Sequence, residues 1–310
     1  MRVALVVNPK AGRNRGLAAA DAAERVLREG GWRVTQRVTA AHGEARKLAA
    51  EAAAERFDAV LACGGDGTLS QVVQGLLDTG VPAGCVPTGT GNDFARTIGL
   101  SQKPTIAARQ LLLGHQAEAD LLEVNGGEHR VLNVMGVGFD ARVAARTNRR
   151  TRLIGGRTAY LTAVGQELIR HQPTDVHLRV GNESWQGRAL LVAVANAKCY
   201  GAGMMIAPRA EIADGLLDVV LVEYVSRLSF LRSFPKVFRG THAEHRAVRM
   251  WQATTCSIET PEPTSVLVDG ELQAQTPVHV RVASRRAKLW MPGALAPATT
   301  RLRLEPSPEA

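Results

Sequence analysis

Long apolar runs are missing from this 310-residue chain. No segment reaches the ~18 consecutive apolar residues that a membrane-spanning helix needs, so we expect any contact with a membrane to be peripheral. The first apolar run, Val3 to Val7, stops at Asn8-Pro9-Lys10 and does not resemble a secretory signal. These absences predict a cytoplasmic protein.

Aromatic residues and paired cysteines are also scarce. Only 4% of the residues are aromatic, which argues against base-stacking platforms, and we expect no nucleic-acid partner. The four cysteines form no C-x-x-C pair and lie in apolar or strand-like runs, so buried free thiols are expected. The G-x-x-x-x-G-K-[ST] motif of Walker-type phosphate loops does not occur, which excludes that class of nucleotide site.

The chain is rich in apolar residues and in positive charge. With 310 residues, 45% of them apolar, it is long enough for two domains or one large one. The net charge of +9 predicts anionic partners, namely nucleotide phosphates, nucleic acid or an acidic membrane face, without choosing among them.

Strands and helices alternate in the first part of the chain. The predicted strands are Arg2–Val7, Trp32–Val38, Asp58–Cys63 and Ala83–Val86, and the predicted helices are Leu17–Glu29, Glu44–Arg56 and Leu69–Leu77. This βαβαβ order predicts an α/β fold with a Rossmann-like, mostly parallel sheet and helices on both faces. We expect this nucleotide-binding domain to cover residues 1–122.

The pattern changes after that point, because strands follow one another more closely and helices are fewer. The predicted strands are Leu121–Val124, Arg130–Met135, Asp175–Val180, Arg188–Val194, Leu217–Val222, Thr254–Glu259, Ser265–Asp269 and Val278–Val282, and the predicted helices are Ala141–Arg150, Thr158–Arg170 and Leu228–Arg239. A β-rich, largely antiparallel second domain is therefore expected over residues 123–289. The segment from about 290 to 310 is expected to return to the first domain.

Three loops follow predicted strands at the edge where α/β sheets bind ligands. They are Asn8–Gly12 (NPKAG), Gly64–Thr68 (GGDGT) and Pro87–Asp93 (PTGTGND). Glycine lets a backbone approach phosphate closely, and amide groups at a helix N-terminus favour an anion. One such loop alone is more often a tight turn, whereas three together favour a nucleotide site. Asp66 and Asp93 would repel phosphate unless a divalent cation lay between them, so a metal is expected as well.

These loops resemble the diacylglycerol kinase catalytic-domain family, in particular its soluble bacterial lipid kinases. The resemblance continues in order through Asn133–Ala141, Asn196–Pro208, Asp214–Asp218 and Asp269-Gly270-Glu271. GGDGT alone would be shared with NAD kinases, but the NPxAG and GTGNDFA segments distinguish the two. The resemblance implies an ATP-dependent kinase that phosphorylates a lipid hydroxyl at a membrane surface, with diacylglycerol as the usual acceptor.

The resemblance also implies which residues bind the nucleotide. They belong to the three loops and to one neighbouring strand end: Asn8, Pro9, Lys10, Ala11, Gly12, Thr39, Gly64, Gly65, Asp66, Gly67, Thr68, Leu69, Ser70, Thr90 and Asn92. Asp66, Asp93 and Asp120 would hold a catalytic Mg²⁺.

The base and a second metal site are implied in the same way. Glu271 would take the proton from the lipid hydroxyl, with Asp269 beside it. A second Mg²⁺ would be bound by the Asp214 side chain and the carbonyl groups of Glu211 and Leu216. From the residues alone, Asp269-Gly270-Glu271 and Asp214-Gly215 are each more typical of turns.

Two further patterns bear on the acceptor and on the membrane. Ala202 stands where the family often has a third glycine, and its methyl group is expected to narrow the neighbouring cleft. A basic cluster, Arg142 to Arg157, is either a solvated helix face or a patch for an anionic membrane.

Alternatives to a diacylglycerol kinase remain open from the sequence. The acceptor could be a sphingoid base, ceramide or phosphatidylglycerol. The enzyme could instead resemble NAD kinase, or the fold could serve a non-catalytic lipid-binding protein. Asp66, Asp93 and Glu271 are all present, which argues against the last alternative. A homodimer formed by pairing of sheet edges is also an expectation.

Overall fold

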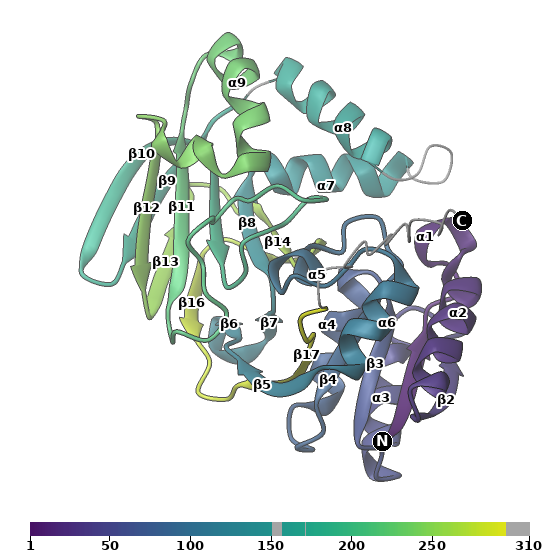
Figure 1. Ribbon diagram of the computed structural model, residues 1–310. Helices are drawn as coiled ribbons and strands as arrows, with labels where there is room; N and C mark the ends of the chain where they lie inside the picture. Colours follow the sequence, from purple (N-terminus) through teal and green to yellow (C-terminus); the bar gives the residue numbers. More distant parts are fainter. Residues whose placement is uncertain (151–156, 171, 296–310) are drawn as a thin grey trace, which may run out of the picture.

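The computed structural model describes residues 1–150, 157–170 and 172–295, which form two domains, each built on one β-sheet (Figure 1). The predicted α/β fold class, with a parallel first sheet and an antiparallel second one, is confirmed. Within the described residues, no helix combines the length and apolar character needed to cross a membrane.

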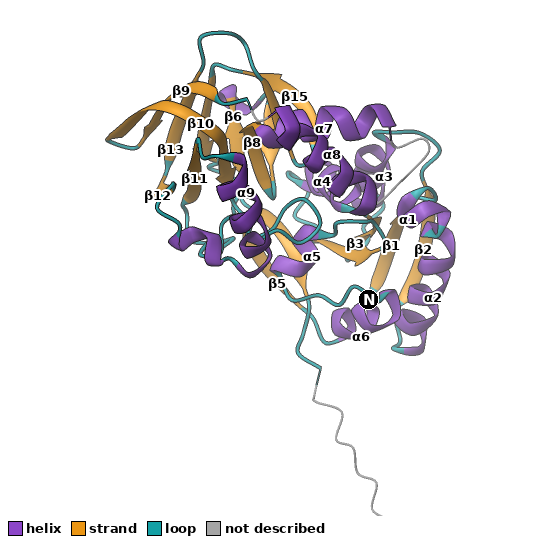
Figure 2. Cartoon of the chain, turned by 90° about the horizontal axis from the view of Figure 1, so that it is seen from above, coloured by secondary structure: helices purple, strands orange, loops and turns teal. Residues whose placement is uncertain are grey.

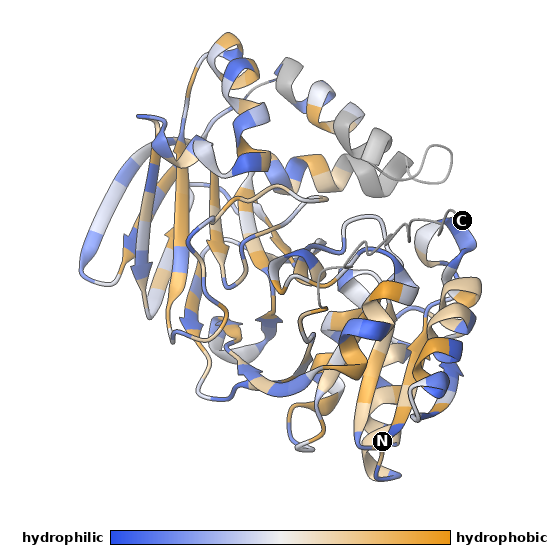
Figure 3. Ribbon diagram, viewed as in Figure 1, coloured by the Kyte–Doolittle hydropathy of each residue, from blue (hydrophilic) through white to orange (hydrophobic). Residues whose placement is uncertain are grey.

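The first sheet has a parallel centre. Its strands, in spatial order, are β2 (Arg33–Val38), β1 (Arg2–Val7), β3 (Ala59–Gly64), β4 (Ala83–Pro87), β17 (Ala287–Met291) and β5 (His115–Ala119). Strands β1 to β4 and β17 run parallel, and β5 pairs antiparallel with β17. Residues Val3–Val7 are fully buried, as expected for a parallel strand covered on both faces. Figure 3 shows the central strands of this sheet as mostly hydrophobic.

Helices cover both faces of the first sheet. They are α1 (Ala11–Asn14), α2 (Gly16–Glu29), α3 (Glu44–Ala54), α4 (Asp66–Leu76), α5 (Asp93–Thr97) and α6 (Pro104–Leu112). Helices α3 and α4 pack together on one face, and α2 and α6 on the other (Figure 2). Alanines such as Ala23 and Ala49 are fully buried at these contacts, because small side chains let helix and sheet approach closely.

The second sheet is antiparallel and larger. Its strands are β6 (Leu122–Val124), β7 (His129–Val131), β8 (Val134–Gly138), β9 (Thr174–Val180), β10 (Glu183–Ala195), β11 (Leu217–Glu223), β12 (Val248–Ala253), β13 (Thr255–Glu259), β14 (Ser265–Val268), β15 (Glu271–Gln275) and β16 (Val278–Val282). Alternate residues of β10 face two different cores: Val192 and Val194 lie in a core formed by the strands, whereas Ala193 and Ala195 lie in a core shared with helices. The second sheet is therefore buried on both faces along the second half of β10, residues 189–195.

The helical segments of the second domain are concentrated on one side of this sheet. They are α7 (Phe139–Arg150), α8 (Arg157–Arg170), α9 (Arg227–Ser233) and the 3₁₀ turns Asn125–Gly127, Phe234–Arg239 and Thr241–Glu244. Phe139 of α7 and Phe230 of α9 belong to the core shared with β10, and their rings lie with centroids 5.3 Å apart at an angle of 51°.

The chain crosses between the domains twice, and the two crossings touch. The first crossing is at Asp120-Leu121, between β5 and β6, and the second is at Ala283–Arg286, between β16 and β17. Ala283 N–H donates to Leu121 O at 2.8 Å, and the Arg286 guanidinium lies 2.8 Å from the buried Asp120 carboxylate. These contacts connect the two domains where the chain crosses between them.

Several predicted elements differ from the structure in detail. Helix α4 begins at Asp66 rather than Leu69, and the predicted strand Arg130–Met135 is two strands interrupted at Leu132-Asn133. The predicted helix Leu228–Arg239 is α-helical only to Ser233 and continues as a 3₁₀ turn. Strands β5, β12 and β15 and helix α6 were not predicted. All four cysteines lie in the described part of the chain and are buried free thiols, as predicted.

Candidate active site

The loop after β1 is tied to the loop after β3 through Asn8. Its side-chain oxygen accepts from Lys10 N–H at 3.1 Å, which closes a tight turn, and its amide nitrogen donates to Thr68 Oγ1 at 3.3 Å. Gly12 adopts φ 58°, and a Cβ there would lie 2.2 Å from Thr88 O. Only glycine allows this loop to pack against the loop after β4.

The loops after β3 and β4 pack backbone against backbone. The amides of Thr88 and Gly89 both donate to Gly64 O, at 2.9 and 3.2 Å. A Cβ on Gly89 would lie 2.5 Å from Gly65 Cα, so these two glycines make the close approach possible. Gly65 precedes α4 and supplies no side-chain cap. Thr68 N–H donates to Gly65 O at 3.0 Å, which leaves the amides of Asp66 and Gly67 at this helix N-terminus for an anion.

These loops enclose a pocket of about 640 Å³, within the size range of ligand sites. Its lining includes many of the residues expected to bind nucleotide: Asn8, Pro9, Lys10, Ala11, Gly12, Thr39, Gly65, Gly67, Thr68 and Thr90. The other expected residues, Gly64, Asp66, Leu69, Ser70 and Asn92, are not part of the lining. Asn92 instead donates to Gly89 O at 3.0 Å and shapes the loop from behind.

Some lining residues were not anticipated from the sequence: Arg13, Ala40, Ala41, His42, Gly43, Ala45, Gln71 and Gly89. Half of them, Ala40 to Gly43, belong to the segment between β2 and α3. This segment has no phosphate-binding motif, and only its position beyond the end of β2 could have indicated a role, because ligands bind outside the carboxyl ends of such strands.

Asp66 and Asp93 face the same small space. A Cβ built on Gly91 would lie 2.9 Å from Asp93 Oδ2 and 3.2 Å from Asp66 Oδ2. Asp66 Oδ1 accepts from Phe94 N–H at 3.0 Å, and Asp93 accepts from the amides of Ala202 and Gly203 at 3.0 and 2.6 Å. Burial, together with the nearby Asp66 charge, raises the pKa of Asp93 to about 6. Two hard oxygen ligands with mutual repulsion are suited to a divalent cation.

Asp120, the third residue expected to hold the catalytic Mg²⁺, has hydrogen-bond and ion-pair partners of its own. Its carboxylate pairs with Arg286 at 2.8 Å and accepts from Gly215 N–H at 2.7 Å, and its own N–H donates to Ile212 O. Among the described residues, no three His, Cys, Asp or Glu side chains gather as a metal-binding group. In this structure Asp120 fastens the domain crossing to the loop that carries Asp214.

Glu271 stands at the wall of the pocket. Its Oε1 lies 3.1 Å from His42 Nε2, and its Oε2 accepts from Gln273 at 3.1 Å. The side chain is 41% exposed, and a Cβ on Gly67 would lie 3.7 Å from Oε1, which places Glu271 above the start of α4. The contact between His42 and Glu271 joins the two domains across the pocket.

Asp269, two residues earlier, is held by amide groups. Its carboxylate accepts from Leu132 N–H at 2.9 Å, Asn133 N–H at 2.8 Å and Ser70 Oγ at 3.2 Å. Burial raises its pKa to about 6. Asp269 itself adopts a left-handed φ of 45°, which turns the chain toward Glu271. Its contacts are those of a positioning residue that fixes the β14–β15 turn against α4.

The residues expected to bind a second metal lie in an exposed turn. Asp214 Oδ1 accepts from Leu216 N–H at 3.0 Å, an ordinary turn contact. The charges of Asp214 and Glu211 also contribute to raising the pKa of Asp218 to about 6, after the larger effect of burial. The three carboxylates are therefore electrostatic neighbours.

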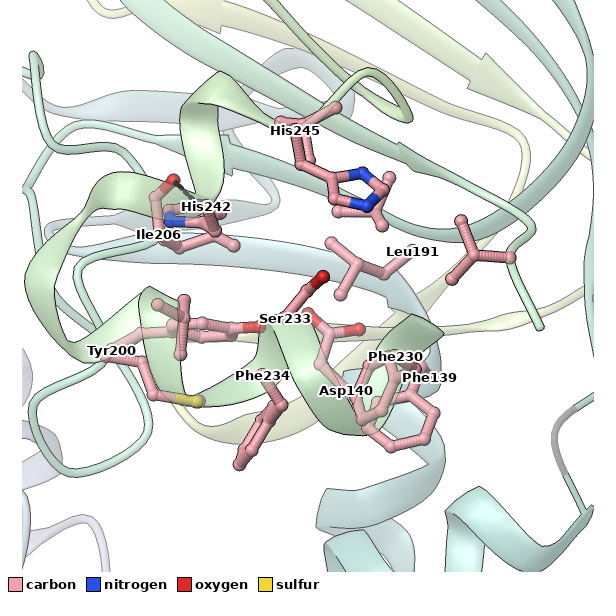
Figure 4. A pocket seen from close by; sticks show the side chains of 15 residues that line it. Phe139, Asp140, Leu191, Tyr200, Ile206, Phe230, Ser233, Phe234, His242 and His245 are labelled. Atoms are coloured by element: carbon pink, nitrogen blue, oxygen red, sulfur yellow. Dashed lines mark hydrogen bonds between the residues drawn. The ribbon is translucent and has the colours of Figure 1, made fainter. Parts of the chain in front are cut away.

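A second, apolar pocket lies in the second domain (Figure 4). Its lining is Phe139, Asp140, Leu191, Tyr200, Met204, Ile206, Val222, Val225, Phe230, Ser233, Phe234, Val237, His242, His245 and Val248. It holds about 80 Å³, room for a few methylene groups. Asp140 is 3% exposed, and within the described residues its Oδ2 has no hydrogen-bond partner. Burial raises the pKa of Asp140 to about 6.

One short loop, Tyr200–Met204, connects the apolar pocket with the acidic pair. The backbones of Tyr200 and Met204 exchange two hydrogen bonds of 3.0 Å, and both side chains line the apolar pocket. Between them, the amides of Ala202 and Gly203 bind Asp93. A molecule in the apolar pocket is thus separated from the acidic pair by a single turn of chain.

The basic cluster Arg142–Arg157 lies partly outside the described residues, because residues 151–156 are not described and the side chains of Arg146, Arg149, Arg150 and Arg157 are not either. Arg142 is described. It pairs with the buried Glu167 at 2.7 Å and donates to Thr174 and to Gln172 O. Arg142 therefore stabilises the packing of α7 on α8 and is not a free surface cation.

Glycine-rich loops over the carboxyl ends of a parallel sheet, with an acidic pair and an opposing glutamate, define a phosphotransferase of the kinase class. The family model described as "Diacylglycerol kinase catalytic domain" matches residues 2–124, and that described as "YegS C-terminal NAD kinase beta sandwich-like domain" matches residues 133–295. The chain belongs to the diacylglycerol kinase family. It is a lipid kinase, a phosphotransferase that uses ATP and an alcohol acceptor.

Individual relatives match over almost the whole chain. The diacylglycerol kinase of Mycobacterium tuberculosis (strain ATCC 25618 / H37Rv) is 35% identical, with 94% of this chain and 95% of that protein covered. A protein of Xanthomonas campestris pv. campestris (strain 8004) named "Probable lipid kinase YegS-like" is 32% identical, covering 93% and 95%. A crystal structure of a diacylglycerol kinase from Bacillus anthracis str. Sterne has a TM-score of 0.73 at 24% identity, covering 94% and 96%, and shows the same fold.

Proposed function

We propose that this protein transfers the γ-phosphate of ATP to the hydroxyl group of diacylglycerol, with Glu271 as the general base. The proposal is carried by the Tyr200–Met204 loop, which contacts the acidic pair at its centre and the apolar pocket at its ends. A lipid whose acyl chains enter that pocket would have its hydroxyl group near the phosphates. The relatives named diacylglycerol kinase support this acceptor.

The residues around the nucleotide pocket suit distinct tasks. Backbone amides of the glycine-rich loops and of the first turn of α4 would hold the triphosphate. Glu271, half exposed above that turn, would accept the proton from the acceptor hydroxyl. Asp269 positions Glu271 through its own backbone turn rather than through proton transfer, since amides and Ser70 occupy its carboxylate. Most of the rate enhancement would come from positioning and charge stabilisation.

Mg²⁺ fits the acidic pair. Asp66 and Asp93 supply hard carboxylate oxygens facing one small space, and their mutual repulsion disfavours the site without a cation. When bound, Mg²⁺ would neutralise charge on the phosphates. We place Asp120 outside this pair because Arg286 already neutralises it. A second Mg²⁺ at Asp214, Glu211 and Leu216 stays a prediction, as does a homodimer.

The test is transfer of radiolabelled phosphate from ATP to a panel of acceptors, in Mg²⁺ and then with a chelator. The lipid panel contains diacylglycerol, ceramide, a sphingoid base and phosphatidylglycerol in mixed micelles, and a soluble panel contains NAD. We expect Mg²⁺-dependent label in diacylglycerol. Label in another lipid would show that the acceptor is that lipid and would leave the proposed phosphate transfer unchanged. Label in NAD alone would contradict a lipid acceptor.

A further inference from the structure

Helix α9 exposes large apolar side chains to solvent. Leu228 is 57% exposed and Leu231 is 56% exposed. Three positions apart on a helix, they lie on the same side. In Figure 1, α9 lies at the end of the second domain remote from α2, and Figure 3 shows hydrophobic and hydrophilic segments side by side on it. Two leucines exposed together on one short helix indicate a binding surface more strongly than single exposed leucines do.

Positive charge surrounds these leucines. The exposed cations of this segment are Arg227 and Arg232 in α9 and Lys236 and Arg239 in the following 3₁₀ turn. Within the described residues, no carboxylate forms an ion pair with any of these four. From Tyr224 to Arg246 the sequence holds a single acidic residue, Glu244. The outer side of α9 is therefore both apolar and cationic.

The inner side of the same segment forms a wall of the apolar pocket. Phe230, Phe234 and Val237 line that pocket, and Phe230 stacks on Phe234 with ring centroids 5.3 Å apart. The pocket volume of about 80 Å³ is smaller than the volume of a lipid acyl chain. The pocket wall formed by α9 and its 3₁₀ turn also carries the exposed Leu228 and Leu231. If the outer side of α9 contacted a hydrophobic medium, the apolar pocket would lie directly beneath that medium.

We propose that the α9 surface (Arg227, Leu228, Leu231, Arg232, Lys236 and Arg239) docks on an anionic lipid bilayer. Leu228 and Leu231 insert below the head groups, and the cations contact lipid phosphates. The proposal rests on the proposed function, because a kinase of bilayer lipids must reach them at the membrane. A second copy of the chain fits this surface less well, since a two-fold interface would place the four cations of each copy against the same cations of the other.

The first experiment measures sedimentation with vesicles of phosphatidylcholine, with and without phosphatidylglycerol, in the absence of ATP. The test variant is Leu228→Ser/Leu231→Ser, and the matched control is Leu17→Ser/Leu113→Ser, which changes two leucines that are 44% and 57% exposed in the first domain. We expect the unmodified protein to bind only the anionic vesicles. Its vesicle affinity should fall by at least about tenfold in the α9 variant and stay the same in the control.

The second experiment tests the charges with Arg227→Gln/Arg232→Gln/Lys236→Gln. The control removes three exposed arginines of the first domain, Arg25, Arg33 and Arg109. Each α9 cation should contribute about fivefold to vesicle affinity at low salt. The control variant should lose much less, because its cations lie in α2, β2 and α6 of the first domain.

Three results would overturn the docking proposal: no binding of the unmodified protein to anionic vesicles, equal binding of the α9 variants, or a shift from dimer to monomer in Leu228→Ser/Leu231→Ser by sedimentation velocity. Phosphorylation of a short-chain diacylglycerol dispersed in solution is measured in parallel and should be unchanged in the α9 variants. If the unmodified protein does not phosphorylate this diacylglycerol, the proposed function is contradicted. Vesicle binding that depends on α9 would in that case still support the docking surface.

Discussion

At Gly91 the chain passes directly beside the two carboxylates that suit a cation. A methyl group there would lie 2.9 Å from Asp93 Oδ2 and 3.2 Å from Asp66 Oδ2, closer than ordinary contact allows. We expect Gly91→Ala to reduce kcat at least about tenfold and to raise the Mg²⁺ concentration for half-maximal activity. Activity measured across a Mg²⁺ titration checks this.

Gly165 provides the matched control for this substitution. It lies in α8, and within the described residues no atom lies within 4 Å of a Cβ built there. Gly165→Ala should keep the activity and add slightly to stability, because alanine favours a helix over glycine. An unchanged Mg²⁺ requirement in Gly91→Ala would remove the acidic pair from metal binding.

Glu271 should matter for turnover and little for stability. Its side chain is 41% exposed, and in the part of the chain that the structure describes its carboxylate contacts the side chains of His42 and Gln273. Glu271→Gln keeps the shape and removes the base, so kcat should fall by about 10²–10⁴. The thermal unfolding midpoint should stay the same. Gln273→Ala serves as control, and activity within a fewfold of the unmodified enzyme in Glu271→Gln would exclude the base role.

Asp140 gives a pH dependence to stability. Burial raises its pKa to about 6 in the folded protein, above the value of about 4 in an unfolded chain. The folded state therefore binds more protons between these values, and stability falls as the pH rises from about 4 to 6. Asp140→Asn should remove that loss, and its stability advantage in urea unfolding should be larger at pH 7.5 than at pH 4. An advantage independent of pH would contradict the raised pKa.

Asp66, Asp93 and Glu271, whose roles stay predictions, could be singled out from the sequence because each lies in a short motif that resembles the diacylglycerol kinase family. His42 could not, since it is a lone histidine, 79% exposed, in a loop without any motif. Its contact with Glu271 depends on how the two domains meet. The pairing of Asp120 with Arg286 could not be predicted for the same reason, because Arg286 belongs to the other crossing of the chain.

At the scale of single elements, the Tyr200–Met204 loop holds an alanine in an unfavourable conformation. Ala202 adopts φ 69°, which costs an L residue roughly 1 kcal/mol. Ala202→Gly should therefore raise the free energy of unfolding by up to about 1 kcal/mol while keeping the N–H that binds Asp93. Ala18→Gly in α2 should do the opposite, because glycine weakens a helix. Chemical denaturation of both variants checks the difference in sign.

Burial pattern explains which elements the sequence revealed. Buried strands such as β1 and β3 are continuous apolar runs and were predicted closely. Strands β5 (HQAEA) and β15 (ELQAQ) are short and mostly exposed, and neither contains an apolar run. Strand β15 alternates polar and apolar residues over only five positions, too few for a prediction. The first turn of helix α4 was not predicted because it falls within the glycine-rich motif, whose glycines are typical of a loop.

At the scale of the whole molecule, the ion pair between Arg286 and Asp120 joins the two domain crossings. The Asp120 side chain is only 2% exposed, so removal of its partner leaves a buried charge. We expect Arg286→Ala to lower the free energy of unfolding by about 3–5 kcal/mol. Arg286→Ala/Asp120→Asn should recover a large part of this loss in a double-mutant cycle.

Arg285 is the neighbouring control. It pairs with Asp78 at an exposed position, and such pairs contribute about 0–1 kcal/mol. Arg285→Ala should therefore have little effect in the same urea titration. Equal losses in Arg285→Ala and Arg286→Ala would show that the crossing is not held by the buried pair.

The position of β17 has a consequence for any attempt to divide the protein. Strand β17 lies between β4 and β5 in the first sheet, although it follows the whole second domain along the chain. A gene fragment that ends at the first crossing would encode a sheet with an empty slot inside it, and β5 would have no strand beside it. Separate expression of the nucleotide-binding half therefore requires β17 to be joined back through a designed linker.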